Sequence, residues 1–416
     1  MSGTNTEAAV KPPFRIHFLI LGCISLLFLG LIYAWSIFRT PLQAMFPDWT
    51  ASDLSLGYTI LMVCFFIGSF VTGKIANKVS PKILFGAAAV ILFAGFMCAS
   101  TIQADDSAGS LIKIYVFYCG GCGLAAGTGH NMMLGVVSKW FPDKQGAASG
   151  TILTAYGLGT VVLGSVARGL MTDHGVPYTF RALAIAGLVV LGGTALCLRS
   201  PAPHTAFPQP KKTTAKAVGA VDMGPSQVIR TLPFWLYMLW AILKSIAGSL
   251  VISNAASIAE YYGAAAVVGL IVSVTNAGSR FIFGNCLDRK GFKLTALLNN
   301  IVMLASGAFM LLGGLTRSIP LIVIGLLCIG AGFGSTPSIS VVFFRKMWGA
   351  RNYQANYSLV TISLMVSAFV APNLSGYLQD NTAAGADPWI SSFVALAIVC
   401  VLSVAASILC VKKTDI

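Results

Sequence analysis

Long runs of apolar residues recur along the chain from about Phe18 to its C-terminal end, with short polar segments between them. Each run approaches the roughly 20 residues that an α-helix needs to cross about 30 Å of hydrocarbon. Helices are the expected elements, because an open sheet would leave backbone groups without partners in lipid and the alternation of a membrane barrel is absent. The pattern predicts an all-α membrane protein with twelve transmembrane helices, at 16–38, 54–76, 82–102, 111–138, 146–170, 178–198, 233–257, 264–286, 294–314, 318–343, 352–378 and 388–411.

The polar segments between these helices indicate the topology. When the segments are assigned alternately to two sides, the side of the N-terminus carries 20 Lys and Arg residues and the other side carries five. Positive residues are enriched in cytoplasmic loops, so both termini are predicted to be cytoplasmic. The longest polar segment, 199–230, is rich in Pro, Lys and Thr and predicts a flexible cytoplasmic linker between two six-helix bundles, at 1–198 and 231–416.

An internal repeat supports this division. The loop after the second predicted helix and the loop after the eighth share a pattern of residues 211 positions apart, which is about half the chain. The matching residues are Gly73, Asn77, Lys78 and Lys82 in the first loop and Gly284, Asp288, Arg289 and Lys293 in the second. Duplicated bundles are typical of transporters that alternate access to a site near the bilayer midplane between the repeats.

The composition agrees with a membrane protein and argues against other classes of protein. Hydrophobic residues make up 56% of the chain and charged residues 10%, against about 25% charged in a soluble domain. The formal charge of +14 follows the loop asymmetry, so no nucleic-acid partner is expected. Cys119 and Cys122 form a CxxC pair without a second pair or a histidine at metal-ligand spacing, and we expect no metal and no cofactor there. No paired carboxylates or nucleophile motif point to an enzyme, and a receptor is disfavoured too.

Two cations fall inside predicted helices, and such residues mark functional sites by default because charge is costly in hydrocarbon. Arg280 lies about 12 Å from the cytoplasmic surface and Lys244 about 16 Å, by helical rise. All thirteen acidic residues fall in predicted tails or loops, so an anionic substrate would supply the countercharge. A guanidinium binds a carboxylate in a bidentate fork, and Asn276, one turn before Arg280, is placed to assist. A structural role satisfied by carbonyls or water is the alternative, and it stays open for Lys244.

His130 lies about 13 Å deep in a Gly-rich predicted helix by the same rise. Histidine is the side chain that titrates closest to neutral pH, and no acidic residue falls in the predicted spans, so His130 is the candidate proton carrier. The alternative is a neutral histidine that bonds across helices.

Several motifs resemble a known family. Gly73 to Lys82 and Gly284 to Lys293 resemble the loop signature of the major facilitator superfamily, with Asn77 in place of the usual acid. Further motifs are similar to the oxalate/formate antiporter group and its monocarboxylate-transporter relatives: Tyr33-Ala34-Trp35-Ser36 with Pro41, Lys139-Trp140-Phe141-Pro142-Asp143-Lys144, Tyr156-Gly157-Leu158-Gly159 and Ala350-Arg351-Asn352-Tyr353.

The resemblance implies roles for individual residues. Arg280 matches the arginine that binds the substrate carboxylate, and Val360 stands where the oxalate/formate antiporter has a second central lysine. Pocket-lining aromatic positions fall on Tyr33, Tyr156, Phe333 and Tyr357, and His130 aligns with another. The loop signature implies conformational roles for Gly73, Lys78, Gly284, Asp288 and Arg289.

We therefore expect a multi-pass transporter of the cell membrane that carries a small monocarboxylate such as lactate, pyruvate, formate or glycolate. Anion exchange and proton symport both remain open as mechanisms. A dicarboxylate such as oxalate, another organic anion or a drug is the alternative cargo. The expected partners are this substrate, a proton or counter-anion and the lipid bilayer, for a protein that works as a monomer.

Overall fold

The computed structural model describes residues 15–202, 205, 207, 222–265, 267–383 and 385–414, and these residues form an all-helical fold. The linker expected at 199–230 lies largely outside them. The N-terminal group consists of α1 (Ile16–Leu29), η1 (Gly30–Ala34), α2 (Trp35–Met45), α3 (Ala51–Ile75), α4 (Pro81–Ala99), α5 (Ser107–Lys113), the π-helical η2 (Ile114–Cys122), α6 (Gly123–Trp140) and α7 (Gln145–Cys197). After the short α8 (Pro225–Val228), the C-terminal group consists of α9 (Leu232–Ile252), α10 (Ala255–Tyr261), α11 (Val267–Thr316), α12 (Ile319–Gly334), α13 (Thr336–Trp348), α14 (Tyr353–Ser358), η3 (Leu359–Thr361), α15 (Ile362–Asp380) and α16 (Ile390–Thr414).

Ten helical stretches within the described ranges are long and apolar enough to cross a membrane. Their outer faces expose large apolar side chains, such as Leu196 at 76% and Val189 at 68% of their surface. An exposed apolar surface of this kind is stable against lipid and unstable against water.

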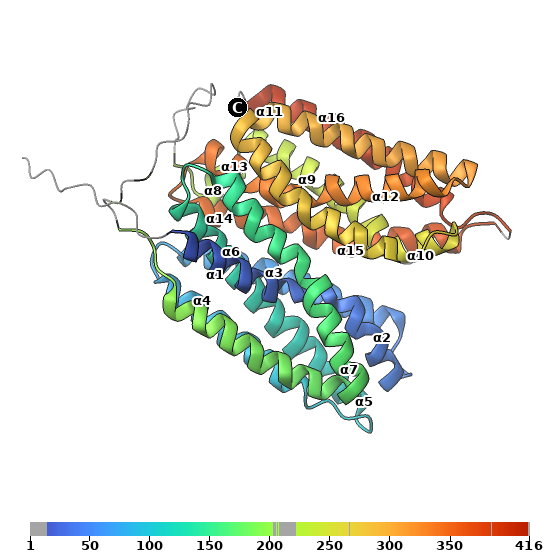
Figure 1. Ribbon diagram of the computed structural model, residues 1–416, viewed down its shortest axis with the longest axis horizontal. Helices are drawn as coiled ribbons and strands as arrows, with labels where there is room; N and C mark the ends of the chain where they lie inside the picture. The colour runs from blue at the N-terminus through green and yellow to red at the C-terminus, as the bar shows by residue number, and fades with distance from the viewer. Residues whose placement is uncertain are drawn as a thin grey trace, which may run out of the picture.

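Two of the ten stretches are much longer than a bilayer requires. α7 has 53 residues and α11 has 50, where the sequence predicted two separate helices each. A straight helix of that length would measure about 75–80 Å, more than twice the hydrocarbon thickness. Gly175 in α7 has φ 79° and Gly291 in α11 has φ 80°, a left-handed region that is accessible to glycine and that bends the chain. The non-helical residue of α7 is Gly175. Figure 1 shows the green helix α7 turning back on itself.

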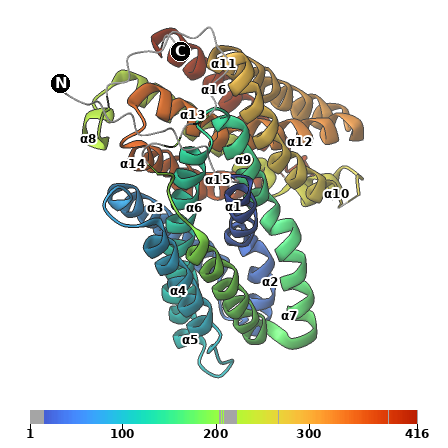
Figure 2. The same ribbon diagram turned by 60° about the vertical axis from the view of Figure 1, so that its left-hand side comes forward.

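The two groups lie side by side, with blue to green helices on one side and yellow to red helices on the other (Figure 1; Figure 2 shows them from a second direction). They meet through α7 against α11 and α13, and through α3 against α14 and α15. The contacts concentrate toward the end of the molecule where α1 begins and α16 ends, and the groups diverge toward the opposite end (Figure 1).

Glycines allow the close approach of α7 and α11. A Cβ on Gly150 would lie 2.5 Å from the carbonyl oxygen of Arg280, and one on Gly157 would lie 3.1 Å from the Arg280 Cζ. The absence of side chains at these positions lets the two helices pack backbone to backbone, as small residues do between membrane helices. This packing sets the depth and direction of Arg280.

Candidate functional site

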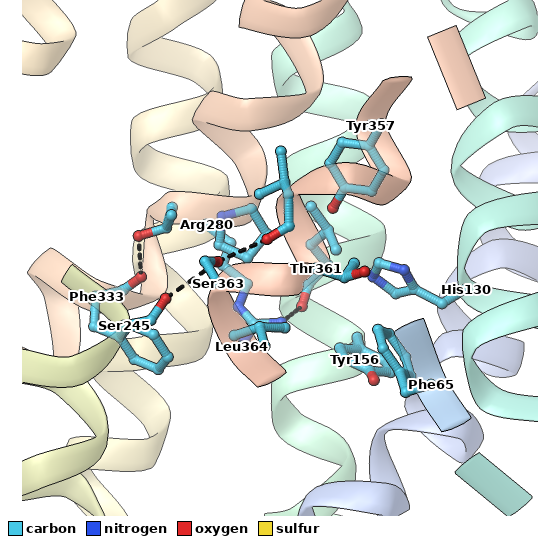
Figure 3. A pocket seen from close by; sticks show the side chains of 14 residues that line it. Phe65, His130, Tyr156, Ser245, Arg280, Phe333, Tyr357, Thr361, Ser363 and Leu364 are labelled. Carbon is cyan, nitrogen blue, oxygen red and sulfur yellow. Dashed lines mark hydrogen bonds between the residues drawn. The ribbon is translucent and has the colours of Figure 1, made fainter. Parts of the chain in front are cut away.

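A cavity lies between the two groups, walled by side chains from both of them. Helices α3, α6 and α7 line it from the N-terminal group, and α9 and α11–α15 with η3 line it from the C-terminal group. Figure 3 shows its side chains. The lining residues are Phe65, His130, Leu153, Tyr156, Ser245, Arg280, Phe333, Thr336, Pro337, Tyr357, Val360, Thr361, Ser363 and Leu364.

Arg280 brings a guanidinium to this cavity, and its side chain is only 5% exposed. Its Nη1 donates to the carbonyl oxygen of Leu153 in α7 at 2.8 Å, and its Nη2 donates to Asn276 Oδ1 at 3.1 Å. The Tyr156 ring centre lies 5.9 Å from the Arg280 Cζ. The guanidinium is therefore oriented by contacts from both groups, and Asn276 supports it without lining the cavity.

His130 belongs to an aromatic wall of the same cavity. Its ring centre lies 4.8 Å from that of Tyr156, 5.4 Å from Phe65 and 6.3 Å from Tyr357. The side chain is 4% exposed, and its Nδ1 is buried without a hydrogen-bond partner among the residues that the structure describes. Buried polar atoms are normally bonded, so this nitrogen is available to a molecule in the cavity.

Lys244 lies elsewhere. Its side chain is 0% exposed and does not line the cavity. Its Nζ donates to Ser335 Oγ at 3.3 Å and lies 4.7 Å from the Trp240 ring centre. Asn299 Nδ2 also donates to Ser335 Oγ, at 2.6 Å, so the lysine belongs to a polar cluster inside the C-terminal group.

Of the residues predicted for the site, the structure brings together Arg280, His130, Tyr156, Phe333 and Tyr357 on one cavity. The side chain of Tyr33 lies outside the described part of the chain.

The residues predicted for the conformational loops lie where the two groups meet. Asp288 accepts hydrogen bonds from the backbone N–H of Gly146 at 2.9 Å and of Ala147 at 2.8 Å, at the start of α7. Gly284 faces the backbone of Gly146, and Gly73 faces the backbone of Gln354 and Ala355. These contacts hold the end of the molecule that carries the start of α1 closed.

Asn77, which replaces the usual acid, donates from Nδ2 to the carbonyl oxygen of Arg351 at 2.6 Å. The repeat is thus asymmetric in its chemistry, with a carboxylate at one contact and an amide at the other. The side chains of Lys78 and Arg289 are exposed.

Comparison with known proteins shows which family the chain belongs to. The sequence profile of the Major Facilitator Superfamily matches residues 18–372, which is most of its length. The chain belongs to this family. It is accordingly a multi-pass transporter of the cell membrane and not an enzyme.

Characterised and uncharacterised family members align with it at low identity. The uncharacterised MFS-type transporter YhjX of Escherichia coli (strain K12) is 24% identical over 82% of this chain and 82% of its own length. The oxalate:formate antiporter of Oxalobacter formigenes is 24% identical, covering 82% of this chain and 80% of that protein. Monocarboxylate transporter 2 of Mus musculus is 22% identical, covering 87% and 78%.

Solved structures of other family members share the fold. The proton:xylose symporter XylE superposes with a TM-score of 0.73 over 96% of both chains, at 12% sequence identity. The E. coli fucose:proton symporter FucP gives 0.70 over 96% of this chain and 99% of its own, also at 12% identity.

The sequence did not predict the serine and threonine side chains that line one side of the cavity. Ser245, Thr336, Thr361 and Ser363 line it from α9, α13, η3 and α15. Serine and threonine are common in membrane helices, so composition gives no warning. A usable signal is the four-residue spacing of Ser245 and Ser249 in one helix and of Ser363 and Ser367 in another, which places hydroxyls on one face of each.

Proposed function

We propose that this transporter carries a small monocarboxylate anion by alternating access and exchanges it for a second anion. The observation that carries the proposal is the Arg280 guanidinium, buried in a cavity between the two groups and lined by aromatic side chains.

The chemistry of the site favours a carboxylate. A guanidinium remains charged at physiological pH and matches a carboxylate in a fork of parallel hydrogen bonds. Two of its hydrogen-bond partners, the Leu153 carbonyl oxygen and the Asn276 amide oxygen, are neutral groups that fix its direction. The relatives named for oxalate, formate and monocarboxylates are consistent with an organic anion as cargo.

The charge count of the cavity favours one carboxylate rather than two. Val360 lines the cavity at the position where the antiporter resemblance leads one to expect a second cation. Lys244 does not supply that charge, because its ammonium is directed at Ser335 inside the C-terminal group. A dianion such as oxalate would bring one more negative charge into this buried space than the lining side chains offset.

We further propose a monomer with twelve spans, both termini in the cytoplasm, and six-helix bundles at 1–198 and 231–416 joined by a linker at 199–230. The glycine bends in α7 and α11 support this count, since each divides a stretch of about 50 residues into two lengths suited to a bilayer. The excess of Lys and Arg on one side supports the orientation.

Exchange fits the site better than proton symport through His130. The imidazole and the Arg280 guanidinium line the same buried cavity, where a second positive charge would be costly. A bound carboxylate would lower the free energy of the buried guanidinium, so the loaded carrier should reorient more easily than the empty one. On this scheme the contacts of Asp288, Gly284 and Gly73 close one side of the site and break when the bundles rock.

The test is uptake of a labelled monocarboxylate by liposomes that contain purified protein. Arg280→Ala and Arg280→Lys should both reduce uptake to background, because neither restores the bidentate fork. Arg168→Ala is the matched control, since Arg168 is an exposed arginine of α7, and it should transport like the wild type. Uptake retained in both Arg280 variants would refute the proposal.

A further inference from the structure

The cavity also contains groups whose hydrogen-bonding character is opposite to that of Arg280. Its hydroxyl groups are buried: Ser245 and Ser363 are each 1% exposed, and Thr336 and Thr361 are each 4% exposed. Figure 3 shows Ser245 and Ser363 pointing toward each other across the junction of α9 and α15.

Each of the four hydroxyl groups donates its hydrogen to a protein oxygen. Ser363 Oγ donates to the carbonyl oxygen of Val360 at 2.7 Å, and Ser245 Oγ donates to Ser363 Oγ at 3.4 Å. Thr336 Oγ1 donates to the carbonyl oxygen of Phe333 at 2.8 Å, and Thr361 Oγ1 donates to that of Ser358 at 2.6 Å.

A hydroxyl has one hydrogen to donate and two lone pairs that accept. With the hydrogens directed at protein oxygens, these four groups present lone pairs to the cavity. This side of the cavity therefore accepts hydrogen bonds, whereas the Arg280 side donates them. Within the described residues, Ser363 Oγ accepts one hydrogen bond, from Ser245, whereas the hydroxyl oxygens of Ser245, Thr336 and Thr361 accept none.

Substrate atoms must match both sides. A carboxylate satisfies Arg280, and a group that donates a hydrogen bond satisfies the serine pair. A ketone or a second carboxylate offers only lone pairs, which would face the lone pairs of Ser245 and Ser363. A plain alkyl group would leave those buried acceptors unsatisfied, which costs binding free energy.

We propose that Ser245 and Ser363 determine specificity, and that the preferred substrate is a small hydroxy-monocarboxylate whose hydroxyl donates to this pair. The inference rests on the proposed function, because it takes the carboxylate at Arg280 as given. A site built to bond a substrate hydroxyl rejects the analogue that lacks it more strongly than a purely apolar pocket does.

Three acids of similar size separate the possibilities: lactate with a hydroxyl, pyruvate with a ketone and propionate with a methylene group. Each has three carbons and one negative charge at pH 7. Apparent dissociation constants come from the stabilisation of purified protein in thermal unfolding as each acid is added. Lactate should bind roughly tenfold tighter than the other two, the scale of one buried hydrogen bond.

The double variant Ser245→Ala, Ser363→Ala should bind all three acids with similar affinity and should bind propionate about as well as the wild type does. The matched control is Ser249→Ala, Ser367→Ala, because this pair repeats the contact one turn further along α9 and α15, also at 3.4 Å, without lining the cavity. The control should keep the preference for lactate.

The outcomes distinguish failure of the specificity assignment from failure of the proposed function. Equal binding of the three acids by the wild type, or a preference that survives in the Ser245→Ala, Ser363→Ala variant, would overturn the specificity assignment and leave the role of Arg280 intact. Failure of all three acids to stabilise the protein would overturn the proposed function, and the specificity assignment with it.

Discussion

Neighbouring residues 244 and 245 have different surroundings, although they lie at nearly the same depth in α9. Ser245 faces the cavity, whereas the Lys244 ammonium lies between Ser335 and the Trp240 ring. Consecutive residues of a helix point about 100° apart, so rotation about the helix axis decides which one meets the substrate. Depth follows from counting residues along the sequence, but rotation follows from packing against neighbouring helices.

This difference explains how far the site could be predicted. Arg280 was identifiable because a charged residue deep in an apolar run has few explanations. Lys244 satisfied the same criterion and yet lies away from the cavity. The serine pair gave no comparable signal, because its function depends on where each hydroxyl hydrogen points, which requires coordinates.

Replacing Lys244 with Met tests its position outside the binding site. We expect Lys244→Met to leave monocarboxylate affinity within about threefold of wild type, because the cavity lining is unchanged. Because an apolar side chain of similar length removes the cost of burying an ammonium group, the variant should be at least as stable as the wild type. Transport kinetics and thermal unfolding of the same preparation measure both effects. A large rise in KM without loss of stability would place the ammonium in contact with the substrate after all.

At the scale of helices, the two glycines with positive φ account for the difference between twelve expected stretches and ten observed ones. Gly175 and Gly291 have backbone angles that lie outside the helical range, so α7 and α11 each consist of two helices joined directly at a sharp bend. Hydropathy predicted the apolar lengths on either side of each bend. The bend itself depends on backbone conformation, which a single glycine in a short loop does not specify.

The contact of α7 with α11 should tolerate no side chain at Gly150. A Cβ there would meet the Arg280 carbonyl oxygen at 2.5 Å and the Phe281 Cα at 3.0 Å, both backbone atoms that cannot move independently. We expect Gly150→Ala to destabilise this conformation by about 1–3 kcal/mol and to lower the maximal transport rate. Thermal unfolding and liposome uptake provide the measurements.

Gly169→Ala is the control for that experiment. Gly169 is also in α7, and nothing lies within 4 Å of a Cβ added to it. Because alanine favours helix more than glycine does, this variant should be neutral or slightly stabilised. Equal behaviour of the two variants would show that the close approach of α7 and α11 is unimportant.

The start of α1 is tied to the loop before α7 by an ion pair. Arg15 donates to Asp143 through Nη1 and Nη2, with the second bond at 2.9 Å, and its Cζ lies 4.8 Å from the Phe141 ring centre. Partial burial raises the pKa of Asp143, but the hydrogen bonds and charge of Arg15 outweigh this and hold the pKa below its ordinary value.

Because the pKa of Asp143 is lower in the folded protein, the ion pair stabilises the fold at any pH above the unfolded-state pKa of about 3.9. This stabilisation is lost as the pH falls through the folded-state pKa. Asp143→Asn should therefore unfold at a lower temperature than wild type by a constant margin between about pH 5 and 8. The margin should shrink only below about pH 4. A margin that changed between pH 6 and 8 would mean that another titrating group is responsible.

At the scale of the whole molecule, the proposal of exchange makes a prediction about driving forces. Uptake into liposomes should require an internal counter-anion and should not be driven by a pH gradient alone. Replacing His130 with Phe keeps an aromatic ring beside Tyr156 and removes the titrating group, so exchange should persist in this variant. Uptake driven by a pH gradient in the wild type and abolished in His130→Phe would instead establish proton symport.

The central claim is that the Arg280 guanidinium binds the carboxylate of the substrate. Equilibrium binding of a labelled monocarboxylate to purified protein tests it without reference to transport mode. Wild type should bind one anion per chain, and Arg280→Lys should lose about 2–5 kcal/mol of binding free energy, or roughly 30-fold or more in affinity. Binding by Arg280→Ala within a few-fold of wild type would contradict the claim.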